Sequence, residues 1–175
     1  MKNKMLFAFA SLCLCLVVQP SRAQTIQYTL QVPDSLKPPS SQLYAFKLKA
    51  VGVQKYQCEG DKWVHKGPSA ELFNDKGVRV GSHGGGPSWK ADLSGDTSLV
   101  TGKARVVIPS TSAGAIDWIL LDASGQGNGM FGKITFIQRL ETNGGKAPKG
   151  GCGEGCTGQV IEVPYTATYY FYKKY

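Results

Sequence analysis

Residues 43–58 read LYAFKLKAVGVQKYQC, and this stretch decides the fold class. Its first apolar side chains, at Tyr44, Phe46, Leu48 and Ala50, alternate with polar ones at Lys47 and Lys49. A period of two is the pattern of a β-strand with one buried face. Near Gly52 the apolar positions change parity before the first phase returns, which predicts a β-bulge at that glycine. We therefore expect one long strand here, bent at Gly52.

Short runs of the same character follow along the chain, separated by Gly, Pro, Asn and Asp. The other candidate strands are residues 25–32, 62–66, 71–73, 78–83, 97–108, 115–123, 134–140 and 165–172. No apolar pattern of helical period continues for more than about two turns. About ten short strands with turn signals between them predict an all-β protein. We expect a single-domain antiparallel β-sandwich or barrel with long Gly/Pro-rich loops.

The alternation also assigns side chains to faces. The residues assigned to a shared face are Val100, Ala104, Val106 and Ile108 in one run, and Ile134, Phe136 and Leu140 in another. Arg139 then lies opposite Phe136, as a solvated or paired charge or as part of a site. Residues 115–123 are apolar at both parities, which predicts a strand buried on both faces with Trp118 in the core.

The first 23 residues have the form of a secretory signal peptide. Lys2 and Lys4 precede an apolar run at residues 6–18, and the small residues Ser21 and Ala23 predict cleavage after Ala23. This run is shorter than the roughly 20 residues that span a bilayer, and no later stretch comes close. We expect residues 1–23 to be removed and residues 24–175 to form one secreted, extracellular domain (periplasmic in a bacterium) with no membrane span.

The charge of the chain excludes some partner classes. The full sequence carries a net charge of +8, and loss of Lys2, Lys4 and Arg22 with the signal peptide lowers it to +5. The remaining basic residues are spread along the chain, without the arginine-rich, aromatic-interleaved stripe of nucleic-acid-binding proteins. We expect no nucleic-acid partner. A weak affinity for acidic polymers or an anionic surface stays open.

Three cysteines follow the predicted cleavage site: Cys58, Cys152 and Cys156. In an oxidising compartment two of them are expected to form one disulfide, and the spacing does not choose among the three pairings. A metal site built on the Cys-x-x-x-Cys pair is the less favoured alternative. The chain has two histidines, which excludes a His-rich metal site, and we expect no metal.

Residues 81–89, GSHGGGPSW, form the most unusual segment and the first candidate site. Four glycines predict positive φ angles or a close backbone approach. His83 is a candidate for acid–base chemistry or for a structural hydrogen bond. Trp89 is either a stacking platform for a sugar ring or cation, or a side chain packed under the loop.

One motif suggests a cofactor and is rejected. Gly127-Asn128-Gly129-Met130-Phe131-Gly132 matches G-x-G-x-x-G. The dinucleotide fingerprint requires a helix after the glycines, whereas a strand pattern follows them here. We expect a hairpin loop at this position and no cofactor.

Several segments together resemble a secreted family catalogued as domain of unknown function 3455. They read VQKYQC at 53–58, the 81–89 segment, AIDWILL at 115–121, IQRLETNGG at 137–145 and PYTATYYFY at 164–172. The resemblance implies a secreted single domain, found in bacteria, fungi and some plants, with a disulfide between Cys58 and Cys152 and an extra cysteine, Cys156. Family members usually have an aromatic residue after the histidine, where this chain has Gly84, which implies a more open site.

The leading hypothesis is an extracellular or cell-wall binding module that is not an enzyme and that holds a polysaccharide or an anionic surface. The candidate ligand-binding residues are His83, Trp89, Arg139, Tyr169 and Tyr172.

Two alternatives stay open. One is an extracellular hydrolase or isomerase acting on a carbohydrate-like substrate, with His83 as general base assisted by Arg139, Asp117 or Asp122. The other is a structural or stress-related apoplastic protein in which Cys156 forms an intermolecular disulfide.

Overall fold

The computed structural model describes residues 30–175. The predicted signal peptide and most of candidate strand 25–32 lie outside the described residues, and residues 30–32 are not in a strand. Every element described below belongs to the compact unit Val32–Tyr175. Within residues 30–175, no helix has the length and apolar composition needed to cross a bilayer.

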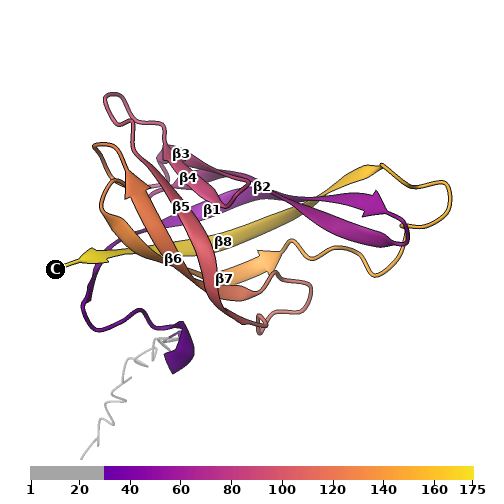
Figure 1. The fold of residues 1–175 in the computed structure, drawn as a ribbon, viewed down its shortest axis with the longest axis horizontal. Helices are drawn as coiled ribbons and strands as arrows, with labels where there is room; N and C mark the ends of the chain where they lie inside the picture. Colours follow the sequence, from indigo (N-terminus) through magenta and orange to yellow (C-terminus); the bar gives the residue numbers. More distant parts are fainter. Residues whose placement is uncertain (1–29) are drawn as a thin grey trace, which may run out of the picture. The chain divides into compact units, whose positions relative to one another are not determined.

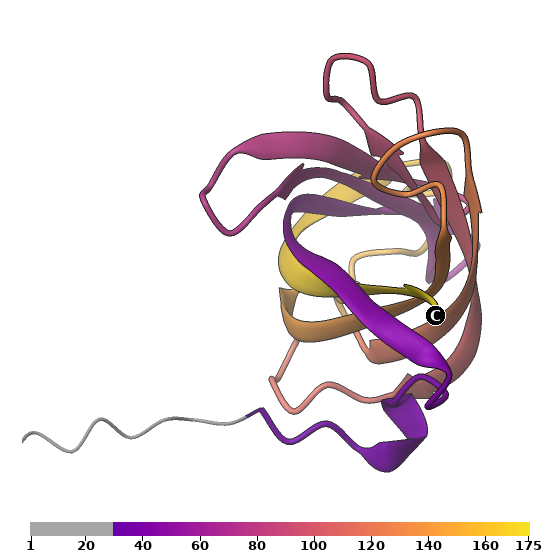
Figure 2. The ribbon, with the colours of Figure 1, turned by 90° about the vertical axis from the view of Figure 1, so that its left-hand side faces the viewer.

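Eight antiparallel strands form a closed barrel, so the expected all-β class is confirmed, as a barrel and not a sandwich. Each strand pairs with the next along the chain, and β8 returns to pair with β1. The elements are the 3-10 turn η1(Asp34–Leu36) and the strands β1(Gln42–Glu59), β2(Lys62–Phe73), β3(Arg79–Gly84), β4(Ser88–Ala91), β5(Leu99–Ile108), β6(Trp118–Gln126), β7(Ile134–Gly144) and β8(Val160–Lys174). Figure 1 labels the eight strands, and Figure 2 shows them arranged around one interior.

One end of the barrel interior is filled with apolar side chains. Phe46 stacks on Phe171 with ring centroids 4.8 Å apart, and Phe131 lies 5.2 Å from Phe171. Leu48 and Ile137 belong to the same buried cluster. Burial of a large apolar side chain contributes about 1.5–3 kcal/mol, so this end supplies much of the stability of the fold.

Strand β6 is buried on both faces, as predicted. Leu121 belongs to the interior cluster, whereas Trp118 and Leu120 belong to a second cluster outside the barrel wall. Leu36 of η1 is fully buried in that second cluster, and the Gln138 side chain donates to its carbonyl at 2.5 Å. The outer face of β6 is therefore covered by the segment that precedes β1, not by a second sheet.

The predicted faces of β5 and β7 are wrong because each strand contains a bulge. The β5–β6 register shifts between Ala104 and Val106, so Ala104 lines the interior while Val106 and Ile108 pack outside. The β7–β8 register shifts between Ile134 and Phe136, which places Ile134 inside and Phe136 and Leu140 outside. One extra residue reverses the side-chain direction of everything that follows it.

The bulge predicted at Gly52 is also wrong, because β1 and β2 pair without interruption at that residue. The side chains of β1 that point into the barrel continue to alternate in the same phase past Ala50, and Val51 is 44% exposed on the outside. Gly52 is needed for a close approach: an added Cβ would lie 2.2 Å from the Ser69 carbonyl oxygen. The β-bulge of this strand pair lies instead in the partner strand β2, where Lys66 is the extra residue.

Residues 62–66 and 71–73 were expected to form two strands and instead form the single strand β2. Pro68 is tolerated inside it, and the Lys66 bulge lies just before Gly67. The predicted hairpin loop at Gly127–Gly132 is confirmed, since β7 follows it directly. Gly127 and Gly129 both have positive φ there.

The disulfide joins Cys58 to Cys152, as the family resemblance implies, and Cys156 has no disulfide partner among residues 30–175. The two Cα atoms lie 5.4 Å apart, and the bridge closes a loop of 94 residues. It ties the end of β1 to the β7–β8 loop, where the β1–β2 hairpin and the start of β8 extend beyond the other strands (Figure 1).

Replacing Cys152 by Ser should lower the free energy of unfolding by about 4 kcal/mol, because a long loop is then unconstrained in the unfolded chain. Guanidinium unfolding under non-reducing conditions measures this loss. Cys156→Ser is the matched control and should leave the unfolding midpoint unchanged. A loss as large for Cys156→Ser as for Cys152→Ser would contradict the pairing.

Candidate functional site

A cavity of about 570 Å³ occupies the other end of the barrel interior. All eight strands contribute to its wall. One lining residue from each strand, in chain order, gives Gln54, His65, His83, Trp89, Gly102, Leu121, Arg139 and Tyr169. The exposed residues Lys66, Lys103 and Ala104 form part of its rim. The barrel interior is thus packed at one end and hollow at the other.

The unusual 81–89 segment forms the β3–β4 hairpin, with a turn at residues 85–87. His83 and Trp89 are direct cross-strand partners, and their rings stack with centroids 4.4 Å apart and planes 8° apart. Gly86 has a φ of +88°, and an added Cβ at Gly81 would lie 2.4 Å from the Lys90 carbonyl oxygen. The glycines therefore allow the tight turn and close packing that hold this ring pair in the cavity wall.

Trp89 is only 1% exposed, so it does not form a surface stacking platform. Its indole fits beside Gly102, where an added Cβ would lie 3.2 Å from Trp89 Cζ3 and 2.9 Å from Leu121 Cδ2. Tyr169 packs edge-on against the same indole at 5.2 Å. The aromatic rings can be reached only by a group that enters the cavity.

His83 is held as a neutral hydrogen-bond acceptor. Its Nδ1 lies 2.8 Å from the Ser88 carbonyl oxygen, which can only accept, so Nδ1 carries the proton and Nε2 has a free lone pair. Burial lowers the pKa of His83 to about 4, against the Ser88 hydrogen bond, which raises it. The Arg139 charge lowers this pKa further. Above that pH the ring is uncharged.

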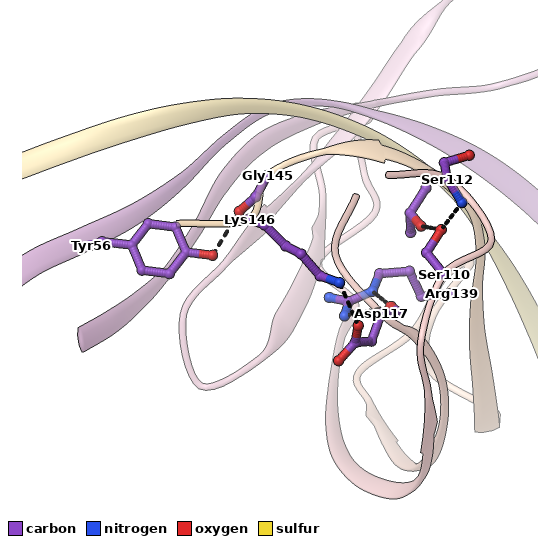
Figure 3. A network of polar contacts seen from close by, with 8 residues as sticks. Tyr56, Ser110, Ser112, Asp117, Arg139, Gly145 and Lys146 are labelled. Atoms are coloured by element: carbon purple, nitrogen blue, oxygen red, sulfur yellow. Dashed lines mark hydrogen bonds and ion pairs between the residues drawn. The ribbon is translucent and has the colours of Figure 1, made fainter. Parts of the chain in front are cut away.

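Arg139 brings a positive charge to the cavity wall. Its Nε and Nη2 atoms donate to the Asp117 carbonyl oxygen at 3.0 and 2.8 Å, as Figure 3 shows. The Asp117 carboxylate is paired instead with Lys146, at 3.4 Å. A guanidinium has five N–H donors, so three remain after these bonds. Among the described residues that line the cavity, none is Asp or Glu.

Several buried polar atoms at this end of the barrel have no hydrogen-bond partner within residues 30–175. They are Gln54 Nε2, Trp89 Nε1, Tyr165 Oη and Tyr169 Oη. Gln54 Oε1 is used by His65 Nε2 at 2.6 Å, which leaves the amide nitrogen unpaired. Burial raises the pKa of Tyr169, against the nearby Arg139 charge and Tyr165 hydroxyl, which lower it, so the Tyr169 hydroxyl keeps its proton. Each unpaired buried group costs about 1–3 kcal/mol.

Four of the five predicted ligand-binding residues come together in this cavity: His83, Trp89, Arg139 and Tyr169. The fifth, Tyr172, does not line it. Its hydroxyl donates to Gln138 Oε1 at 2.6 Å, and its ring lies 6.0 Å from that of Tyr44.

Sequence reasoning missed Gln54 and His65. The unbroken alternation of β1 places Gln54 on the same face as Leu48 and Ala50, so a polar residue in that series was the available signal. No comparable signal marked His65, because the Lys66 bulge determines its direction.

The proposed carboxylate assistants lie elsewhere. Asp117 is engaged with Lys146, and the Asp122 carboxylate accepts from Arg105 at 3.3 Å. Neither lines the cavity. Within residues 30–175, no group of three or more His, Cys, Asp or Glu side chains is arranged to hold a metal ion.

The stability of the barrel should fall on mild acidification because of His83. The unfolded histidine, with a pKa near 6.5, binds a proton more readily than the folded one, with a pKa of about 4. The free energy of unfolding should therefore drop by about 3 kcal/mol as the pH falls through this window. His83→Asn, which retains a donor for Ser88, should remove that part of the pH dependence. Identical urea-unfolding profiles for both proteins between these pH values would contradict this assignment.

The comparisons with known proteins give one match. The model of the family described as "Protein of unknown function (DUF3455)" matches residues 39–173, which include all eight strands except the last residue of β8. No curated protein and no solved structure matches the chain.

Proposed function

The chain belongs to the DUF3455 family of proteins of unknown function, and we propose that it binds a small organic molecule in the hollow end of the barrel. The cavity volume of about 570 Å³ lies in the range of small-molecule sites, about 300–1,000 Å³. Its lining combines aromatic and aliphatic walls with a few polar groups, which is the composition such sites have.

One observation carries the proposal: three residues of the cavity wall, Gln54, Trp89 and Tyr169, each have a buried polar atom without a well-formed hydrogen bond. Native proteins pair nearly all buried polar atoms, and a cluster of exceptions calls for a cause. Gln54 and Tyr169 belong to this cluster, and each is at most 2% exposed. These atoms have almost no accessible surface in the empty barrel, so a ligand would supply their hydrogen-bond partners as the side chains turn toward it.

The geometry favours a small molecule over a polysaccharide surface. A polymer chain would need exposed rings to lie across, whereas Trp89 and Tyr169 are each only 1% exposed. The ligand must instead enter the cavity, whose rim includes the exposed residue Ala104. A binding module remains the leading function, but the ligand occupies a cavity and does not lie on an exposed stacking surface.

Binding is also favoured over catalysis. His83 Nε2 is free to accept a proton, which is the observation that supports an enzyme. However, a general base works best with a pKa near the working pH, and burial lowers that of His83 to about 4. Its Nδ1 partner is a backbone carbonyl and not a carboxylate, and that hydrogen bond raises the pKa by less than burial lowers it.

A secreted location completes the proposal, supported by the Cys58–Cys152 disulfide, which persists in oxidising compartments. The full chain, expressed in a secreting host, should be recovered outside the cytoplasm with Gln24 as its first residue. Intact-mass measurement of the exported protein tests this. Retention of the full-length chain inside the cell would contradict it.

Filling the cavity should abolish binding without unfolding the barrel. Ala104→Trp places a large side chain at the exposed rim, and Val51→Trp makes the same kind of change on the outer surface. Compounds that raise the melting temperature of the native protein in a small-molecule screen should lose that effect in Ala104→Trp and keep it in Val51→Trp. The proposal fails if Ala104→Trp responds to every such compound as the native protein does.

A further inference from the structure

The Arg139 charge has no acidic partner inside the cavity. Its two bonds go to the Asp117 backbone carbonyl, which is uncharged, and the Asp117 carboxylate is paired with Lys146 outside the described cavity lining. Arg139 also lowers the pKa of both His65 and His83, so its field reaches across the cavity. The hollow end of the barrel is therefore positive and lacks a counter-charge.

The unpaired groups near Arg139 are hydrogen-bond donors. Tyr169 is the direct cross-strand partner of Arg139, and its hydroxyl lies near the Tyr165 hydroxyl and the Arg139 guanidinium without a well-formed hydrogen bond to either. Gln54 belongs to β1, the other neighbour of β8. Its amide oxygen is bonded to His65, and its amide nitrogen has no well-formed hydrogen bond, although the side chain lies near the Tyr165 hydroxyl. Free N–H and O–H groups beside a guanidinium require a ligand that offers acceptors and negative charge.

The rest of the cavity wall is apolar. Ile119, Leu121 and Pro68 line it together with the stacked His83–Trp89 pair. Such a wall stabilises an apolar or aromatic body and gives no hydrogen bonds to a polyol. The ligand should therefore carry its acceptors at one end only.

We propose that the barrel binds a small monocarboxylate with an aromatic or apolar body, its carboxylate held by Arg139 with Gln54 and Tyr169. This inference rests on the proposed binding function and specifies its ligand class. A phosphate monoester fits less well, because its second charge would need another cation. Lys66 is already paired with Glu59, and Lys103 lies at the exposed rim.

The test compares a carboxylic acid with the corresponding uncharged amide. The probes are 4-hydroxycinnamate and 4-hydroxycinnamamide, which share shape and ring and differ in the charge of one group. Isothermal titration calorimetry of the native protein should give a dissociation constant at least tenfold lower for the acid. A tenfold change is about 1.4 kcal/mol, below the usual strength of a hydrogen bond to a charged group.

Two Arg139 variants and one control variant test whether Arg139 holds the carboxylate. Arg139→Gln should weaken binding of the acid at least tenfold and leave binding of the amide within threefold, with Arg139→Lys intermediate for the acid. Lys90→Gln makes the same charge change on an exposed residue outside the cavity and should leave both dissociation constants unchanged. Circular dichroism confirms folding of each variant, and if Arg139→Gln does not fold, Arg139→Lys and the acid–amide comparison decide.

The outcomes separate the two proposals. Equal affinity for acid and amide, or equal loss in Arg139→Gln and Lys90→Gln, overturns the carboxylate assignment while the binding function stands. Binding of the amide alone also overturns the carboxylate assignment and leaves the binding function in place. If neither probe binds at millimolar concentration while uncharged compounds stabilise the protein, the carboxylate assignment falls. If no compound of either kind binds, both proposals fall.

Discussion

Closure of the sheet by the pairing of β1 with β8 is the constraint on which the rest of the structure depends. The pairing runs from Gln42 opposite Lys174 to Gln57 opposite Val160 and closes the eight strands into a barrel. Inward side chains of all eight strands must then share one interior. A polar group placed there can reach water only through an open end, so its partners must come from other interior residues or from a ligand.

The interior is divided along the barrel axis, and the two parts have different roles. Phe46, Phe131 and Phe171 fill one end with mutually packed rings, which provides stability. At the other end Arg139 and Tyr169 sit in a wall with unused hydrogen-bonding capacity. Proteins commonly tolerate such unfavourable groups where function needs them, provided that the remainder of the core offsets the cost.

Much of the fold could be predicted from alternation, because a period of two reports a strand directly. The choice between sandwich and barrel could not, because both bury alternate side chains in the same way. Bulges at Arg105 and Thr135 also went unseen, since the extra residue carries no apolar signature, and the faces beyond them were assigned incorrectly.

The site was predicted in part for the same physical reasons. His83 and Trp89 stood out because their glycine-rich surroundings are unusual for a strand. Arg139 was placed on the correct side relative to Phe136, but only the closed barrel reveals that this side is the interior. Gln54 became visible only when β1 proved to continue in phase through Gly52.

The most direct test of the central claim, that the hollow end of the barrel receives a ligand, uses the three indole N–H signals in a proton–nitrogen NMR spectrum. Trp89 lines the cavity, Trp118 packs outside the barrel wall, and Trp63 donates to the Gly150 carbonyl at 2.9 Å. Titration with 4-hydroxycinnamate should shift the Trp89 signal and leave the Trp63 and Trp118 signals in place. A Trp89 signal that stays fixed while another indole shifts, or three fixed signals at saturating probe, would contradict the account.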